Sequence, residues 1–385
     1  MPQRAIPAVF MRGGTSKGLF FHRRDLPADP AEWEPIFLAA IGSPDPYGRQ
    51  LDGMGGGLSS LSKVMVVAPS SRPGIDAEYT FGQVAVGEAL VDYGANCGNL
   101  TSAIGPFAVD EGLVEAEDGE ATLRLYNTNT DKVIESRFGV RDGRALAEGE
   151  QAIPGVAGRG APIRLSFLDP GGAATGRLLP TGNVVDRLEL EGFDAIETSI
   201  VDATTPVAFV RAADLGLAGA EMPDELEASP GLLARLEAIR QAAARAAGLP
   251  AGGRSVPKVG IVAPPQEGRT LAGERLAAEA MQLTTRIMSM GRPHRALPLT
   301  GALCTAVAAA IEGTLAAEAR VGGGDLVVAQ PSGLMRLSAE VERQPDWRAV
   351  RAQVLRTARR LMEGRVLVPE ARLAGAVPLH VTADA

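Results

Sequence analysis

Residues 92–106 have the sequence Asp92-Tyr-Gly-Ala-Asn-Cys97-Gly-Asn-Leu-Thr-Ser-Ala-Ile-Gly-Pro106. A glycine-rich turn here places a lone cysteine directly before Asn99 to Val109, a run that predicts a helix. Free backbone N–H groups and the positive end of the helix dipole converge at such a start. Cys97 can therefore carry thiolate character, and the N–H groups beside it can hold a carboxylate. The alternative interpretation is a buried structural cysteine, but the Gly and Asn neighbours favour the reactive one.

The composition is that of an ordinary globular chain. With 385 residues, of which 45% are hydrophobic, its length suits two domains better than one. The formal net charge of −8 argues against nucleic acid as the main partner, because phosphate binding requires a dense basic face. The most apolar run, Leu303 to Ile311, is too short to span a bilayer. The first residues lack the apolar stretch of a signal peptide, and with only two cysteines in the chain we expect a cytoplasmic protein.

The sequence predicts neither a metal nor a cofactor. Its three histidines, His22, His294 and His380, lie far apart, and no Cys-x-x-Cys pair occurs, so a zinc site lacks ligands. The glycine-rich segment from Asp52 to Lys63 is not a dinucleotide fingerprint, because that motif follows a strand and opens a helix. Here a loop opens a strand.

Two apolar runs, Ala8 to Met11 and Leu19 to Phe21, flank a glycine-rich turn and predict a hairpin. The turn carries two cations, two hydroxyls and several glycine N–H groups, which together suit an anion. As a generic hairpin tip it would need only the glycines. The candidate binding residues in this turn are Arg12, Gly14, Thr15, Ser16 and Lys17.

Lys63 stands between a loop rich in Gly and Ser and the apolar strand Val64 to Ala68. The loop contains too many small residues for packing, and it ends at this lysine. We therefore interpret Lys63 as a candidate active-site cation or acid. The alternative is a surface lysine at a strand end.

The second half of the chain repeats the first. Residues 201–215 align without a gap with residues 12–26, and residues 257–264 repeat 62–69. A capped helix follows the first match in both copies, and a helix ending in Glu-Gly recurs later. Four matches in the same order favour duplication over chance.

The alignment of the two copies pairs Thr204 with Thr15 and Lys258 with Lys63. It predicts two similar domains, residues 1–183 and 184–385, that face each other across a cleft, with a last strand that can return to the first domain. Residues 347–362 fit the helix period and the strand period about equally well.

The alignment also tests the second cysteine. The position equivalent to Cys97 falls at about Pro298 to Thr300, whereas Cys304 lies inside the following helix among Ala302, Leu303 and Ala306. Cys304 is therefore predicted to be a core residue, and the cleft to hold one thiol.

Eight short motifs are spread over nearly the whole chain: Met11-Arg-Gly-Gly-Thr-Ser-Lys-Gly18, Ile41-Gly-Ser-Pro-Asp-Pro-Tyr47, Asp52-Gly-Met-Gly-Gly56, Ser62-Lys63, Asn96-Cys-Gly-Asn-Leu100, Pro180-Thr-Gly-Asn183, Ser289-Met-Gly291 and Leu361-Met-Glu-Gly364. They resemble the PrpF-like family of 2-methylaconitate isomerases, within the diaminopimelate epimerase and proline racemase superfamily. The first and fifth motifs are the specific ones.

The resemblance implies an α+β fold of two epimerase-like domains, each a sheet wrapped around a central helix. It also implies cofactor-independent isomerisation of unsaturated tricarboxylates, with Lys63 and Cys97 as the catalytic pair. The candidate substrate-binding residues beyond the hairpin are Gly56, Gly98, Asn99, His294, Thr300, Ser332 and Gly333.

The presence of one predicted cysteine in the cleft separates this chain from the racemases, which need a cysteine on each side of a stereocentre. Double-bond migration fits better, because removal of an allylic proton gives a dienolate that one acid/base pair can reprotonate elsewhere. Glycine N–H groups, Arg12 and Lys17 would hold the developing charge, and His294 is an alternative base ranked below Lys63. A 4-oxalomesaconate tautomerase and a non-catalytic carboxylate-binding or accessory protein stay open, as do the choice of acid and a homodimeric assembly.

Overall fold

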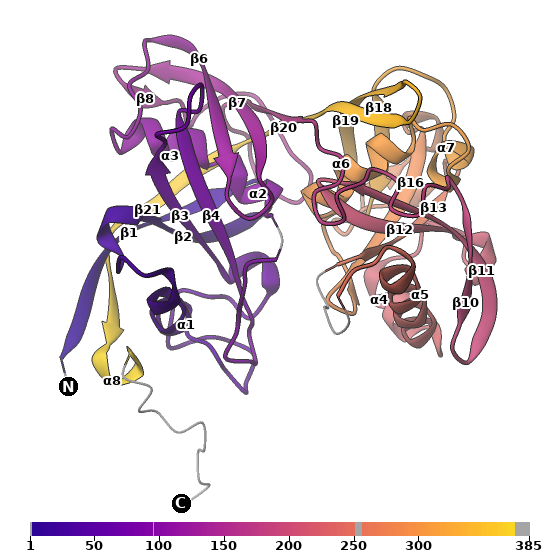
Figure 1. The fold of residues 1–385 in the computed structure, drawn as a ribbon, viewed down its shortest axis with the longest axis horizontal. Coiled ribbons are helices and arrows are strands. Elements are labelled where there is room, and N and C mark those ends of the chain that lie inside the picture. The colour runs from indigo at the N-terminus through magenta and orange to yellow at the C-terminus, as the bar shows by residue number, and fades with distance from the viewer. Residues whose placement is uncertain (1, 95, 251–255, 374–385) are drawn as a thin grey trace, which may run out of the picture.

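The computed structural model describes residues 2–94, 96–250 and 256–373. Figure 1 shows two lobes side by side. Strand pairing is continuous between them, because β20 (Trp347–Arg356) lies between β9 (Ile163–Leu168) of the first lobe and β19 (Gly333–Arg343) of the second. The junction between the lobes is therefore itself part of the sheet.

The first lobe is a curved sheet in the order β21-β1-β2-β3-β4-β6-β7-β9. Within this order only β2–β3 and β4–β6 are parallel. The last strand of the chain completes this lobe by pairing with β1 along its length. The bounds are β1 (Gln3–Gly13), β2 (Ser16–His22), β3 (Lys63–Pro69), β4 (Ala77–Val84), β5 (Val91–Asp92), β6 (Gly119–Asn127), β7 (Lys132–Arg141), β8 (Arg144–Ala145) and β21 (Ala358–Pro369).

The second lobe repeats this order as β10-β11-β12-β13-β16-β18-β19-β20, and its parallel steps, β12–β13 and β16–β18, fall at the same places. The predicted duplicated α+β fold is thereby confirmed. The bounds are β10 (Asp186–Leu190), β11 (Phe193–Ala203), β12 (Thr205–Arg211), β13 (Lys258–Ala263), β16 (Leu283–Ser289), β17 (Arg292–Pro293) and β18 (Leu326–Gln330), with β14 (Gly268–Arg269) and β15 (Arg275–Leu276) as a separate pair.

Each sheet has helices on both faces. The inner helices are α2 (Gly98–Thr101) and α3 (Ile104–Asp110) in the first lobe, and α6 (Leu299–Ala308) and α7 (Leu315–Ala319) in the second. They share one hydrophobic core. The outer helices, α1 (Trp33–Ile41) on one lobe and α4 (Pro223–Ala228) with α5 (Leu232–Ala246) on the other, cover two separate cores. The short α8 (Glu370–Leu373) follows β21.

The helix predicted from Asn99 to Val109 is divided in two. Hydrogen bonds of the first turn run from Thr101 N to the Cys97 carbonyl and from Ala103 N to the Leu100 carbonyl, and α3 then begins at Ile104. Pro106 explains the division, because it has no N–H to bond the carbonyl four residues earlier and its ring crowds that carbonyl. The inner helix of the first lobe therefore presents only one turn beside Cys97.

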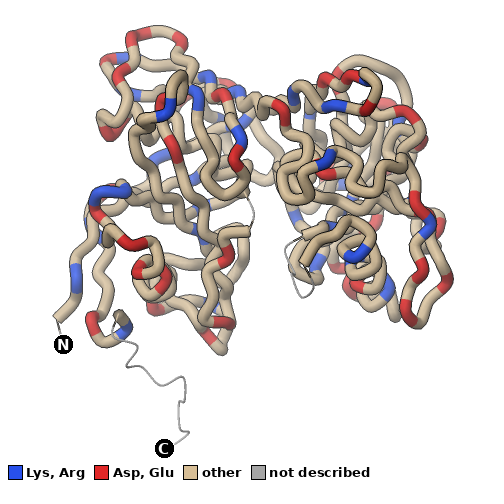
Figure 2. Tube along the Cα trace, in the orientation of Figure 1, with Lys and Arg blue, Asp and Glu red and all other residues tan. Residues whose placement is uncertain are grey.

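Charges of both signs are mixed along both lobes (Figure 2). This pattern agrees with the net negative charge of the sequence and shows no extended cationic stripe in that view. Among the helices that the structure describes, none has the length and apolar character needed to cross a membrane.

Candidate active site

Lys63 lies on the inner face of the first lobe. It is the first residue of β3, and strand alternation places it with Met65 and Val67, which belong to the inner core, and not with Val64 and Val66 under α1. Only 8% of the residue is exposed. The predicted lysine at a strand start is therefore buried and faces the inner helices.

The ammonium group of Lys63 is held by β4. Its Nζ donates to Oε1 of Gln83 at 2.5 Å and lies 4.9 Å from the centre of the Phe81 ring. The amide of Gln83 in turn donates to the carbonyl of Ser62 at 3.0 Å. This chain of contacts fixes the position of the amine.

The glycine-rich loop before Lys63 folds around Gln50. Oε1 of Gln50 accepts hydrogen bonds from the N–H of Gly57 at 2.9 Å and the hydroxyl of Ser62 at 2.6 Å. A Cβ on Gly56 would lie 2.7 Å from Cδ1 of Leu61, so this glycine is required by the packing of the loop. Gly56 is thus packed against Leu61 in the loop that precedes Lys63.

Cys97 occupies the N-cap position of α2, as the sequence predicted for a helix start. Its surroundings are less polar than its Gly and Asn neighbours suggested, because only 7% of the residue is exposed and it packs in the inner core. The hydroxyl of Tyr79 lies 3.0 Å from Oγ1 of Thr101 and 3.3 Å from Oδ1 of Asn96, so it ties the turn together on both sides of the cysteine. Burial raises the pKa of Tyr79 to about 12.

The hairpin tip lies against the first turn of α2. Nδ2 of Asn99 donates to the hydroxyl of Thr15 at 3.1 Å. Gly14 has φ +51°, and a Cβ on it would lie 2.3 Å from Oδ1 of Asn99. Ser16 is buried in the same region, so Gly14, Thr15, Ser16, Gly98 and Asn99 form one neighbourhood around the start of α2.

The two cations of the hairpin lie on the other face of the sheet. Gly13 and Gly18 face Leu100 of α2, so the alternate residues Arg12 and Lys17 point away from it. Nη1 of Arg12 donates to the carbonyls of Gly14 and Thr357, both at 3.0 Å. Nζ of Lys17 lies 5.6 Å from the centre of the Phe10 ring. The structure does not bring these two side chains to Cys97.

The second lobe builds the same arrangement with different residues. The hydroxyl of Thr204, at the tip of the equivalent hairpin, donates to the carbonyl of Thr300 at 2.8 Å. Thr300 is the second residue of α6, as Asn99 is of α2. The two helix starts meet, because a Cβ on Gly98 would lie 3.1 Å from Cδ2 of Leu299.

The N-cap position of α6 is Pro298, so the second lobe has no thiol where the first has Cys97. Cys304 lies deeper in α6, is fully buried and donates to the carbonyl of Val201 at 3.3 Å. Burial raises the pKa of the Cys304 thiol. The prediction that Cys304 is a core residue is confirmed.

His294 lies within electrostatic range of lysines from both lobes. Its Nδ1 is 2.6 Å from the carbonyl of Ala296, so Nδ1 carries the hydrogen and Nε2 is the free acceptor. Burial lowers the pKa of His294 to about 4; the bond to Ala296 opposes the shift, and the charges of Lys63 and Lys258 add to it. The ring is therefore neutral at pH 7 and a weak base.

The loop around Gly155 connects the remaining candidates. A Cβ on Gly155 would lie 3.3 Å from Cγ2 of Thr15 and 3.4 Å from Oγ of Ser332, and Gly333 lies against Pro154. Ser332 also donates to the carbonyl of Arg295 at 2.7 Å. Thr15 and Ser332 are thus neighbours across the lobes. No motif in the sequence pointed to this loop, because its position depends on contacts with residues far along the chain.

Lys258 belongs to this cluster, although it was not among the predicted site residues. It begins β13 opposite Val207, as Lys63 begins β3 opposite Gly18, and only 8% of it is exposed. Burial and then the charge of Lys63 lower the pKa of Lys258 to about 8, while Asp92, Cys97 and Cys304 act in the opposite direction. The signal that could have found it was its match to Lys63 in the repeat.

The family model described as "PrpF protein" matches residues 3–369. The chain belongs to the PrpF family. It is 38% identical to a 2-methyl-aconitate isomerase of Shewanella oneidensis, over 96% of this chain and 98% of that protein. It is 39% identical to a (4E)-oxalomesaconate Delta-isomerase of Novosphingobium, over 96% of this chain and all of that protein.

Solved structures agree with this assignment. A methylitaconate-delta-isomerase is 36% identical, with 99% of this chain and 100% of that chain covered and a TM-score of 0.81. A hydroxyproline epimerase from Agrobacterium vitis, only 14% identical, covers 94% of this chain and 93% of its own with a TM-score of 0.55, and shows the epimerase-like fold alone. This PrpF-family chain is an isomerase.

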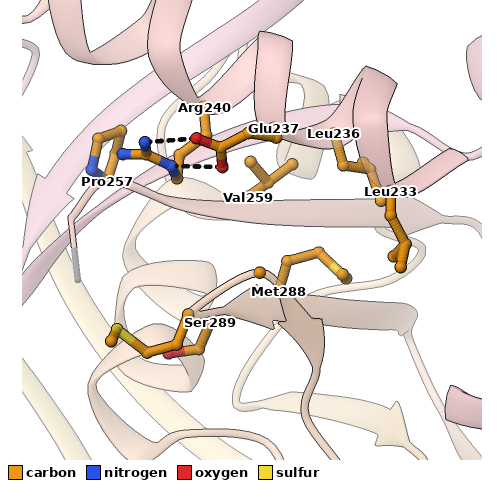
Figure 3. A pocket seen from close by; sticks show the side chains of 10 residues that line it. Leu233, Leu236, Glu237, Arg240, Pro257, Val259, Met288 and Ser289 are labelled. Carbon is orange, nitrogen blue, oxygen red and sulfur yellow. Dashed lines mark hydrogen bonds and ion pairs between the residues drawn. The ribbon is translucent and has the colours of Figure 1, made fainter. Parts of the chain in front are cut away.

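Figure 3 shows a separate pocket on the outer side of the second lobe, between α5 and the strands β13 and β16. Its enclosed space is about 20 Å³, room for one water molecule. Glu237 and Arg240 form an ion pair at its rim, beside Leu233, Leu236 and Met288. A pocket of this size cannot take an organic acid.

Within residues 2–94, 96–250 and 256–373, no group of three or more His, Cys, Asp or Glu side chains is placed to hold a metal ion. The chemistry described below uses the side chains of the chain itself.

Proposed function

We propose that this isomerase moves a proton and a double bond within an unsaturated tricarboxylate, most closely as a 2-methylaconitate cis-trans isomerase. The proposal is supported by a buried amine, Lys63, and a helix-start thiol, Cys97, which both belong to the inner side of the first lobe, while the second lobe has Pro298 at the equivalent cap. Inversion of a saturated stereocentre needs an acid on each face, whereas an allylic shift does not.

The reaction proceeds in two balanced steps. One member of the pair takes the proton from the carbon next to the alkene, and the C–H electrons spread over the alkene and its carboxylate as a dienolate. A proton then returns, to the other end of the allyl system or to the original carbon after rotation. No electrons leave the substrate, so the groups present suffice.

His294 is a poorer base for the first step. With its pKa lowered to about 4 it is neutral but weakly basic near pH 7, and a general base is most effective with a pKa near the working pH. Its free Nε2 is better suited to accept a hydrogen bond from the substrate. His294 therefore stays ranked below Lys63, which can accept the proton only as the neutral amine.

Deuterated water tests the proposal. The chelator-treated, dialysed enzyme should convert 2-methylaconitate and introduce deuterium at its allylic carbon, because a proton held by Lys63 or Cys97 exchanges with solvent before it returns. Diaminopimelate and proline serve as controls and should stay unlabelled. Racemisation of either amino acid, with every tricarboxylate unchanged, would refute the assignment.

A second candidate is keto–enol tautomerisation of 4-oxalomesaconate, favoured by the 39% identity to a (4E)-oxalomesaconate Delta-isomerase. The same amine and thiol can perform that proton shift. Relative kcat/KM on 2-methylaconitate, methylitaconate and 4-oxalomesaconate separates the two. A protein that binds these acids without converting any of them would be an accessory carboxylate-binding protein.

Three further expectations belong to this proposal. We expect residues 1–183 and 184–385 to be the two repeated domains, with β21 exchanged into the first. We expect a cytoplasmic location, which suits the two free cysteines. A homodimer is tested by light scattering on the purified protein.

A further inference from the structure

Each lobe places one lysine at the same point of its fold. Lys63 and Lys258 are the first residues of β3 and β13. In each lobe this strand pairs in parallel with the second strand of the hairpin, β2 or β12. Both residues are 8% exposed. The duplication has therefore kept the amine in both lobes and the thiol in only one.

The two lysines lie within electrostatic range of each other. The charge of Lys63 lowers the pKa of Lys258, and the charges of both lysines lower the pKa of His294, the residue that follows β17. The other ionisable groups that face Lys258 are Asp92 on β5, Cys97 at the start of α2 and Cys304 in α6. His294 is neutral and Cys304 lies in the core, so among the described groups that act on Lys258 the carboxylate is that of Asp92 and the second ammonium group is that of Lys63.

We propose that Lys258 is a substrate-binding residue that holds a carboxylate of the substrate from the second lobe, opposite Lys63 and Cys97. The inference rests on the proposed function and adds the group that recognises the acid. Two like charges brought together away from water repel each other. A bound carboxylate relieves that repulsion, and a polycarboxylate has enough groups to engage both lobes.

The same contact assists the chemistry. When the allylic proton leaves, negative charge moves onto the carboxylate conjugated with the new double bond. An ammonium group already fixed beside that carboxylate stabilises the charge without having to reorganise. Lys258 thus supplies, from the second lobe, the positive charge beside the substrate carboxylate. Arg12 and Lys17 do not supply it, because they lie on the other face of the first sheet.

Calorimetry with propane-1,2,3-tricarboxylate tests the inference without turnover, because this saturated acid has no allylic proton. The variants are Lys258→Met, Lys258→Arg and, as control, Arg164→Met, which removes one exposed charge from β9. The Lys258→Met variant should bind about tenfold or more weakly. The Arg164→Met control and Lys258→Arg should bind within a few-fold of wild type.

Proton uptake gives a second readout. With a pKa of about 8, Lys258 is half neutral at pH 8, and an anion beside it favours the charged form. Wild type should therefore take up about half a proton per acid bound at pH 8, measured as the dependence of heat on buffer ionisation enthalpy. Lys258→Met should lose this uptake, and Lys258→Arg should lose it while keeping affinity, because arginine stays charged.

The outcomes are distinguishable. If wild type neither binds this acid nor converts any unsaturated tricarboxylate, the proposed function fails and the inference with it. If wild type is active but Lys258→Met binds the acid like Arg164→Met, the inference alone fails. Should Lys258→Met not fold, the absence of proton uptake by wild type at pH 8 overturns the inference by itself.

Discussion

Asn99 and Thr300 hold the same position in the two lobes, the second residue of the inner helix, and each is bonded to the threonine at the tip of its own hairpin. In the first lobe Nδ2 of Asn99 donates to Thr15, and in the second the Thr300 carbonyl accepts from Thr204. The hairpin tip and the helix start therefore move as one unit in each lobe. Residues at the starts of the two inner helices that bind or react with substrate are therefore held in fixed positions.

The catalytic pair gives the first prediction. Lys63→Ala and Cys97→Ser should each lower kcat by a factor of about a hundred or more, since each removes a proton-transfer group. Circular dichroism should show both variants folded. Near-normal turnover by a folded variant would remove that residue from the mechanism.

The thiols give the second prediction. Iodoacetamide on native protein should label Cys97 before Cys304, because Cys97 caps a helix at 7% exposure and Cys304 is fully buried. Activity should fall in step with the labelling, and substrate should slow both. A Cys304→Ala variant should behave like wild type in this assay; labelling of Cys304 ahead of Cys97 would contradict the assignment.

The third prediction concerns the stability cost of Lys258. Its pKa falls from 10.5 in the unfolded chain to about 8 in the fold, so the unfolded state binds more protons between these values and the free energy of unfolding rises with pH across that window. Below pH 8 the folded protein carries a constant penalty of roughly 3 kcal/mol.

Lys258→Met should therefore be more stable than wild type at pH 7, by up to about 3 kcal/mol in urea unfolding. The advantage should shrink as pH approaches 10.5. A variant that is less stable at pH 7, with a difference that does not depend on pH, would show that the lysine is not destabilised by its surroundings. A gain in stability with a loss of activity is the usual trade-off at a functional site.

The fourth prediction tests the hairpin contact. Gly14→Ala should destabilise the protein by about 1–3 kcal/mol, because alanine is strained at φ +51° and its Cβ would lie 2.3 Å from Oδ1 of Asn99. Gly112→Ala is the matched control, with φ +66° and no described atom within 4 Å. If the midpoint temperature of thermal unfolding falls equally in both variants, the effect comes from backbone strain alone and not from the contact with Asn99.

The sequence was sufficient for the parts of the fold that repeat. The match of Lys258 to Lys63 predicted two strands in the same place, and the structure pairs them with Val207 and Gly18 as the alignment requires. A repeat can be recognised in a single sequence because its two copies can be aligned with each other. The same match could have led to Lys258 as a site residue.

Other features depended on contacts that a sequence does not display. The turn composition indicated that Arg12 and Lys17 belong with an anion site, but the side on which they lie is set by strand register against α2. Residues 347–362 had no distinguishing period, because buried and exposed residues do not alternate regularly along β20 and the first half of β21 is mostly exposed. Gly155 is placed by neighbours from both lobes.

The pairing of β21 with β1 has a consequence for synthesis of the protein. Residues 3 and 369 are opposite each other at one end of this pair, and residues 13 and 358 at the other. The first lobe leaves the ribosome early, yet one edge of its sheet stays open until nearly all of the second lobe has been translated. During that interval β1 is an unpaired edge that can pair with another chain, so the pairing with β21 also closes this edge against association.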